Sequence, residues 1–99
     1  MQEAEFFTHI DRDELGAIAR RIRRPTYVYF RRLISHQYRR VLETLPRGVT
    51  INYAIKANPY TPLLGELRKL GAGADVASAG EMRGALAAGF SPQDIEFSG

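Results

Sequence analysis

The chain has 99 residues, of which 44% are hydrophobic and 25% are charged, with a formal net charge of +3 and no cysteine. Because typical domains run to roughly 100–200 residues, two full domains are excluded, and the lack of cysteine excludes a disulfide framework, a Cys-ligated zinc and a thiol nucleophile within these residues. No apolar run approaches the roughly 18–20 residues of a membrane span, and the acidic start is unlike a signal peptide, so we expect a cytoplasmic protein with no membrane partner.

Arginines are concentrated in the first half of the chain, where residues 1–50 hold ten Arg or Lys against six acidic residues. A nucleic-acid binder would make such a patch continuous and interleave aromatic residues with it, whereas these arginines fall inside amphipathic helical patterns beside acids. We interpret them as solvated helix faces and do not expect nucleic-acid binding. A small α/β module that binds an anionic partner through these helices is the alternative function. The arginines form the pairs Arg20-Arg21, Arg23-Arg24, Arg31-Arg32 and Arg39-Arg40.

Two helices and a strand are predicted before Pro46. Asp11 and Glu14 have the spacing of a capping box, and apolar residues follow at helical period, which predicts a helix over 12–22. The β-branched and aromatic run over 26–30 then indicates a strand. A second apolar stripe with arginines opposite predicts a helix over 31–45.

The remainder of the chain alternates short apolar strands with helices of about ten residues. The predicted order is a strand over 49–55, a helix over 61–70, a strand over 74–77, a helix from the capping pair Ser78 and Glu81 to Ala88, and a strand over 95–97. Strands alternating with helices imply parallel pairing through right-handed crossovers. The sequence therefore predicts an α/β fold of the order β-α-β-α-β.

Lys56 is the main candidate for chemistry. On the predicted strand, Asn52, Ala54 and Lys56 share the face opposite the bulky residues, and the carboxyl ends of parallel strands are where α/β folds bind ligands. Partial removal of water there favours the neutral amine, a nucleophile that forms Schiff bases with carbonyls, including the aldehyde of pyridoxal phosphate. The alternative is a loop-edge lysine whose charged head extends into solvent.

Asp75 is the second candidate, because an unpaired carboxylate within a buried strand is costly and needs a partner. Either it projects toward the same mouth as Lys56, or it accepts hydrogen bonds from backbone amides of the adjoining glycine turn. Glu81 is better explained as part of a helix cap. No metal site is expected, since His9 and His36 have no acid or cysteine at ligand spacing.

Four segments of the second half of the chain form one combined pattern. They are Tyr53-Ala-Ile-Lys-Ala-Asn-Pro59, Leu70-Gly-Ala-Gly-Ala-Asp-Val-Ala-Ser-Ala-Gly-Glu81, Ala87-Ala-Gly-Phe90 and Ile95-Glu-Phe-Ser-Gly99. Together they resemble the opening of the fold-type III pyridoxal-phosphate-dependent decarboxylases, the group of ornithine, diaminopimelate and arginine decarboxylases. The resemblance begins at about Pro25 and runs to the last residue, and it leans toward the diaminopimelate branch. An alanine-racemase or aldolase relative would also carry a lysine near the first barrel strand, but the stretch around Asp75 argues against it.

This resemblance implies a fold, a cofactor and a reaction. Lys56 would be the Schiff-base lysine of pyridoxal 5'-phosphate, Ala54 would line the cofactor and Asp75 would approach it. An L-amino acid would be the substrate and lose its α-carboxylate as carbon dioxide, and the full-length family member would be a homodimer.

A complete (β/α)8 barrel needs about 250 residues, so the resemblance implies the N-terminal part of a TIM-type barrel with about three strands, preceded by a helix and a short strand. We expect an N-terminal helical segment over 1–24 and a partial cofactor-binding barrel domain over 25–99. The family's phosphate-binding and dimer-contributed parts lie outside these residues. We therefore expect no decarboxylase activity from the 99 residues alone.

Overall fold

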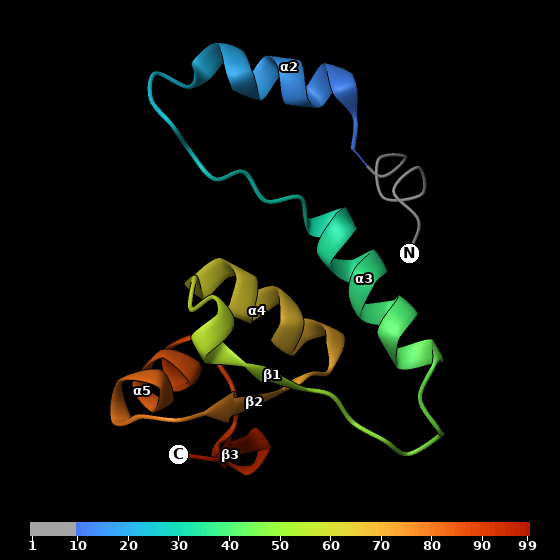
Figure 1. Ribbon diagram of the computed structural model, residues 1–99, viewed down its shortest axis with the longest axis vertical. Coiled ribbons are helices and arrows are strands. Elements are labelled where there is room, and N and C mark those ends of the chain that lie inside the picture. Colours follow the sequence, from blue (N-terminus) through green and yellow to red (C-terminus); the bar gives the residue numbers. More distant parts are fainter. Residues whose placement is uncertain (1–9) are drawn as a thin grey trace.

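The computed structural model describes residues 10–99 of the chain. The first helix, α2 (Arg12–Arg21), begins at the N-cap Asp11, whose carboxylate accepts hydrogen bonds from the backbone amides of Asp13 and Glu14. None of the α2 side chains is buried, and the helix stands away from the sheet (Figure 1). The predicted helix over 12–22 is confirmed to within one residue.

The predicted strand over 26–30 is wrong. This segment has no regular secondary structure, and the side chain of Tyr27 is 91% exposed. Aromatic and β-branched residues favour a pleated, half-buried surface rather than an intrinsic backbone conformation. The segment has no neighbouring strand among residues 10–99, because the sheet there consists of three other strands. It ends at Phe30, the extended N-cap of the next helix.

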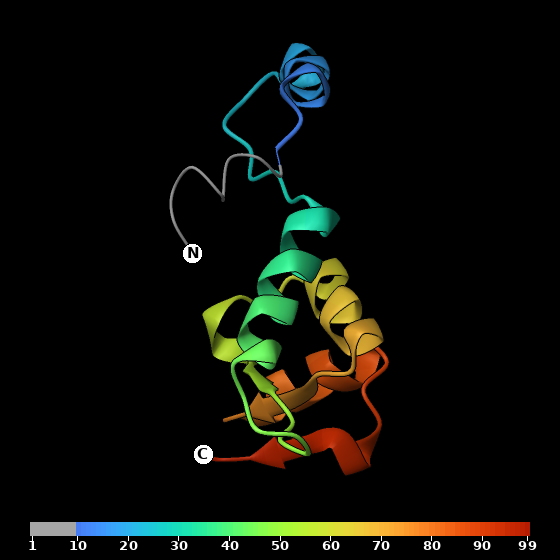
Figure 2. The same ribbon diagram turned by 90° about the vertical axis from the view of Figure 1, so that its right-hand side faces the viewer.

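Helix α3 (Arg31–Glu43) presents one apolar stripe, as predicted, and ends two residues before the predicted boundary. It lies alongside α4 (Thr61–Leu70), an arrangement that both ribbon views show (Figure 2). Between them, Tyr38, Leu67 and Ala72 form a small buried cluster. The ion pair from Arg32 to Glu14, at 2.7 Å, links α3 to α2, but both side chains are largely exposed and such pairs contribute little to stability.

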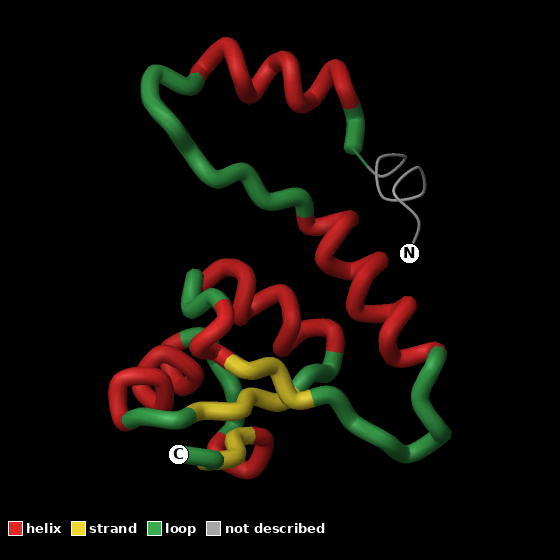
Figure 3. The backbone as a smooth tube through the Cα atoms, viewed as in Figure 1, coloured by secondary structure: helices red, strands yellow, loops and turns green. Residues whose placement is uncertain are grey.

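Three parallel strands form the sheet, in the order β1 (Asn52–Ala54), β2 (Gly73–Val76) and β3 (Ile95–Phe97). Figure 3 shows them as neighbouring yellow segments. The prediction of parallel strands is confirmed. The first strand is shorter than predicted at both ends. Residues 49–51 have no regular secondary structure, and the chain turns into a 3-10 helix, η1 (Ile55–Ala57), directly after Ala54.

The two crossover helices begin and end where the sequence predicts. Helix α4 has proline in its first turn and ends at Gly71, whose φ of 104° is a left-handed conformation that favours glycine. Helix α5 (Ala79–Ala87) is capped by Ser78, which accepts a hydrogen bond from the amide of Glu81. In return, the Glu81 carboxylate accepts from the amide of Ala77 at 2.9 Å. A short 3-10 helix, η2 (Pro92–Asp94), leads into β3.

One face of the sheet carries the main core. Ile55, Leu64, Ala74, Val76, Ala85 and Phe90 are buried together, with Tyr53 and Ile95 packed against them. Consecutive strands joined by crossovers of the same hand place their helices on the same face of the sheet, as in the wall of a barrel. The radius of gyration, 15.4 Å, exceeds the value of about 13 Å for a compact chain of 100 residues.

The buried face provides a test of this packing. Leu64 is fully buried, whereas Leu86 on α5 is 45% exposed. Leu64→Ala should lower the free energy of unfolding by about 2–5 kcal/mol, or abolish the cooperative transition, while Leu86→Ala should cost about 1 kcal/mol or less. Urea denaturation followed by circular dichroism measures both, and equal losses in the two variants would contradict the described core.

Candidate active site

The sheet face opposite the core carries a row of aligned residues. Ala54 pairs with Asp75, and Asp75 pairs with Glu96 in the parallel register. Because side chains alternate along a strand, these three residues share the face away from Ala74 and Val76, which are fully buried. Ala54 and Asp75 are half-buried and Glu96 is exposed. The register thus brings together two of the predicted site residues, from different strands.

Lys56 lies just past the end of β1 rather than on the strand, which corrects the predicted boundary. It is the middle residue of η1, so the alternation that placed it on the same face as Ala54 does not reach it. Ile55, the first residue of this turn, is fully buried in the core. The Lys56 side chain is exposed, and its amine makes no hydrogen bond or ion pair within residues 10–99. The sheltered mouth that the sequence predicted is not formed by this part of the chain.

Asp75 has a partner that the sequence reasoning missed. Its carboxylate accepts a hydrogen bond from the hydroxyl of Ser98, which follows β3. The amide of Ser98 is in turn bound to the carbonyl of Val76 at 2.9 Å. The partner of Asp75 is thus a side-chain hydroxyl rather than a backbone amide of the glycine turn, the second of the two alternatives. The costly isolated carboxylate is therefore avoided.

Glu96 was also missed, although the signal was present. In the predicted strand over 95–97, Ile95 packs on the core, so the middle residue has to point to the opposite face. Parallel alignment with the second strand then places this carboxylate beside Asp75. The combination of strand alternation with strand order would have found it.

The loop after Lys56 is fastened by a group of tyrosines around Asn58. The Asn58 side chain donates to the hydroxyl of Tyr29 at 2.9 Å, and its carbonyl oxygen accepts from the amide of Tyr60 at 3.1 Å. The hydroxyl of Tyr53 donates to the Asn58 backbone carbonyl at 3.2 Å. The rings of Tyr29 and Tyr60 stack with centroids 4.9 Å apart. These contacts connect the irregular segment over 26–30 to the turn that carries Lys56.

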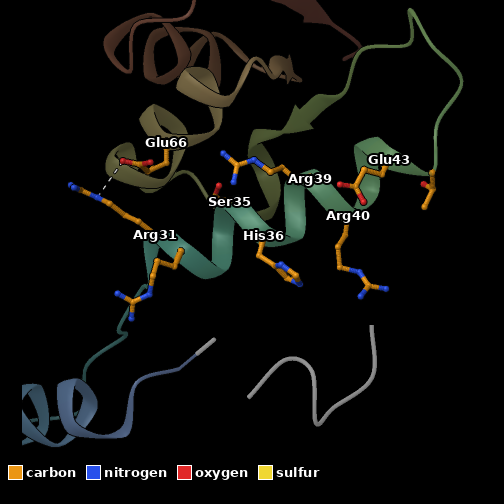
Figure 4. Close-up of a pocket in the computed structure, with 9 residues that line it drawn as sticks. Arg31, Ser35, His36, Arg39, Arg40, Glu43 and Glu66 are labelled. Carbon is orange, nitrogen blue, oxygen red and sulfur yellow. Dashed lines mark ion pairs between the residues drawn. The ribbon is translucent and has the colours of Figure 1, made fainter. Parts of the chain in front are cut away.

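The arginine-rich helix α3 lines a separate hollow, together with Glu66 of α4 (Figure 4). Arg31 reaches Glu66 at 3.2 Å across it, so part of its positive charge is already balanced. None of the lining residues belongs to the three strands. This arrangement agrees with the interpretation of the arginine pairs as solvated helix faces.

Two further structural findings bear on the sequence expectations. Among residues 10–99, none of the helices combines the length and the apolar character that a bilayer crossing requires. The same part of the chain has no group of three or more His, Cys, Asp or Glu placed to hold a metal ion. His9 lies outside the described residues.

Parallel strands in sequence order, a core on one face and a lysine just beyond the first strand define part of a lysine-bearing β/α barrel. The chain belongs to the pyridoxal-dependent decarboxylase family: the model of its pyridoxal binding domain matches residues 31–99. The predicted family, fold class and cofactor are thereby confirmed.

Related proteins agree with this assignment. Diaminopimelate decarboxylase of Pseudomonas fluorescens is 48% identical over 88 residues, which cover 86% of this chain and 21% of that protein. L-glutamyl-[BtrI acyl-carrier protein] decarboxylase of Niallia circulans is 35% identical over 92% of the chain. These curated relatives are therefore about five times as long as the matched region, since it spans 21% of each of them.

Solved structures share the fold. Lysine decarboxylase of Selenomonas ruminantium has a TM-score of 0.76 at 33% identity. The match covers 89% of this chain and 24% of the lysine decarboxylase chain. Diaminopimelate decarboxylase of Helicobacter pylori, solved with L-lysine, has a TM-score of 0.75 at 33% identity. The match covers 84% of this chain and 21% of the Helicobacter pylori chain. The predicted lean toward the diaminopimelate branch is confirmed by the relatives.

Tyr53 makes the site loop sensitive to alkaline pH. Burial raises the pKa of its phenol, and the negative charge of an ionised Tyr29 raises that pKa further. A raised pKa means that the folded state holds the phenol proton more tightly than the unfolded state does. The stabilising contribution of Tyr53 is therefore fully present below the unfolded-state pKa of about 10, and it is lost as the pH rises through the folded-state pKa. Urea midpoints at pH 8 and pH 10.5 should differ less in Tyr53→Phe than in the original chain.

Tyr27→Phe is the matched control, because the Tyr27 ring is 91% exposed. Removal of the Tyr27 hydroxyl should leave the alkaline loss of stability unchanged. An undiminished alkaline loss in Tyr53→Phe would contradict the described environment of the phenol.

Proposed function

We propose that the chain is the N-terminal part of the cofactor-binding barrel of a pyridoxal-phosphate-dependent L-amino-acid decarboxylase of the diaminopimelate type. In this proposal the Lys56 amine holds the cofactor, Ala54 lines it and Asp75 approaches it. The observation that carries the proposal is the alignment of Ala54 with Asp75 on the open sheet face, with Lys56 in the turn that follows.

The residues present fit such a cofactor. Ala54 is small and leaves room above the sheet, and the neighbouring Asp75 supplies a carboxylate that is fixed by the Ser98 hydroxyl. Lys56 supplies an exposed primary amine, the group that condenses with an aldehyde. The site also lies at the carboxyl ends of the strands, where barrel enzymes place their catalytic groups.

The division of chemical work follows from these groups. When bound, pyridoxal phosphate supplies an electron sink for the pair released as the substrate carboxylate leaves as carbon dioxide. Lys56 acts as the covalent anchor, and its amine must lose a proton before it can act as a nucleophile. Asp75 contributes fixed negative charge beside the anchor, and the Ser98 hydroxyl restricts its orientation. Glu96 adds a second carboxylate on the same face.

The substrate and the assembly belong to the proposal as well. The names of the relatives favour diaminopimelate as the amino-acid substrate. We also propose a homodimer in the cytoplasm for the full-length protein, and a division of this chain into an N-terminal helical segment over 1–24 and the partial barrel over 25–99. The anionic-partner alternative finds no support among the related proteins.

Covalent trapping tests the role of Lys56 directly. The chain contains two lysines, Lys56 and Lys69, and Lys69 lies on α4 beside Glu66, so it is an internal control. We expect pyridoxal phosphate followed by borohydride to label Lys56 in preference to Lys69, as measured by peptide mapping with mass spectrometry. The proposal would be contradicted if the two lysines were labelled equally and if unfolding the chain in urea did not change the ratio of Lys56 labelling to Lys69 labelling.

A chimera tests the reaction. In Pseudomonas fluorescens diaminopimelate decarboxylase, the segment that matches this chain over 88 residues is replaced by the matched region of the chain. The chimera should release carbon dioxide from diaminopimelate, with Lys56→Ala reducing turnover to background and Lys69→Ala leaving it unchanged. The isolated 99-residue chain should be inactive. A folded, cofactor-loaded chimera with an intact Lys56 and no turnover would refute the assignment.

A further inference from the structure

The turn that carries Lys56 is held from outside the sheet. Asn58 closes the turn, since its amide donates to the carbonyl of Ile55 at 3.1 Å. The Asn58 side chain then uses both ends: its amide group donates to the Tyr29 hydroxyl, and its oxygen accepts from the amide of Tyr60. A residue from the irregular segment before α3 is thereby tied to the turn two residues beyond the lysine.

Further contacts keep this tie in one arrangement. The stacked rings of Tyr29 and Tyr60 lie within 19° of parallel, which fixes the direction from which the Tyr29 hydroxyl reaches Asn58. On the other side, the hydroxyl of Tyr53 donates to the Asn58 backbone carbonyl. Tyr53 is itself packed against the buried core. Asn58 is therefore held between the core and the aromatic stack.

The position of the Lys56 amine depends on this turn. No residue within 10–99 pairs with that amine, so its location follows from the backbone of η1 and from the rotamers of an exposed side chain. Small displacements of a reacting group from its productive geometry are costly: about 1 Å can reduce a rate by about a hundredfold. A contact that fixes the turn therefore affects where the amine can react.

We propose that Tyr29 and Asn58 are a positioning pair for Lys56, which rests on the proposed function of Lys56 as the cofactor anchor. Neither side chain takes part in the chemistry; together they restrict the backbone from which the amine extends. The proposal also assigns a role to the segment over 26–30. Within this segment, whose aromatic residues suggested a strand, Tyr29 is the residue that holds the site loop.

The variants separate the hydroxyl from the ring. Tyr29→Phe keeps the stack on Tyr60 and removes only the acceptor of the Asn58 hydrogen bond. Asn58→Ala removes both side-chain hydrogen bonds. Asn58→Asp keeps the acceptor for the Tyr60 amide, and its carboxylate can accept a hydrogen bond from the Tyr29 hydroxyl. Tyr27→Phe is the control in the same segment, because this ring is 91% exposed.

The first measurement uses trapping on the purified 99-residue chain, with the initial labelling rate of Lys56 divided by that of Lys69 in the same molecule. Tyr29→Phe should lower this ratio by about twofold to tenfold, the effect of losing one hydrogen bond. Asn58→Ala should lower it at least as much, and Tyr29→Phe should have no further effect in that background. Tyr27→Phe should leave it unchanged.

The second measurement needs no cofactor. Hydrogen exchange of the backbone amide of residue 58 should accelerate in Tyr29→Phe and Asn58→Ala, and it should be closer to the original rate in Asn58→Asp. The exchange rates of the α5 amides should not change in any of these variants. The two failures are distinguishable. If the original chain labels Lys56 preferentially and Tyr29→Phe changes neither measurement, the positioning pair is wrong and the anchor stands. If the cofactor-loaded chimera with Pseudomonas fluorescens diaminopimelate decarboxylase carries no adduct on Lys56 after borohydride, the anchor is wrong and the positioning role falls with it.

Discussion

The alternation of side chains along β2 is the constraint on which the structure depends. Ala74 and Val76 are fully buried against the helices, so Asp75 between them has to face the other side. Parallel pairing carries this arrangement to the neighbouring strands, where Ala54 and Glu96 align with Asp75. A shift of register by one residue would exchange the two faces, burying the carboxylates and exposing the core. The packing that stabilises the sheet therefore also builds the candidate site.

Sequence patterns predicted most of the secondary structure, because the relevant signals are local. Helix caps such as Asp11 and Ser78, and the left-handed glycine at the end of α4, act within a few residues and mark boundaries directly. The strand at 26–30 failed for the opposite reason. Strand formation requires a partner strand, and composition alone does not reveal whether one is present.

The candidate site was predictable in part. Ala54, Lys56 and Asp75 stood out through their place in a strand and turn pattern, and the register brings Ala54 and Asp75 together. The Ser98 and Tyr29 contacts join residues 23 and 29 positions apart in the chain, and no periodicity encodes such pairs. The strand and the 3-10 turn that follows it both place Ile55 in the core, so the apolar pattern alone did not reveal that Lys56 lies in a turn.

The order of the strands has a consequence for biosynthesis. Within residues 10–99, each strand pairs with the next strand along the chain, so this part of the sheet can grow in the direction in which the ribosome delivers it. The loops that these pairings close are short compared with the length of a whole barrel, and the entropic cost of closing a loop rises with its length. The lysine turn and the neighbouring carboxylate of Asp75 can therefore be in place as soon as the third strand has emerged, so that a nascent chain already presents these candidate site residues together.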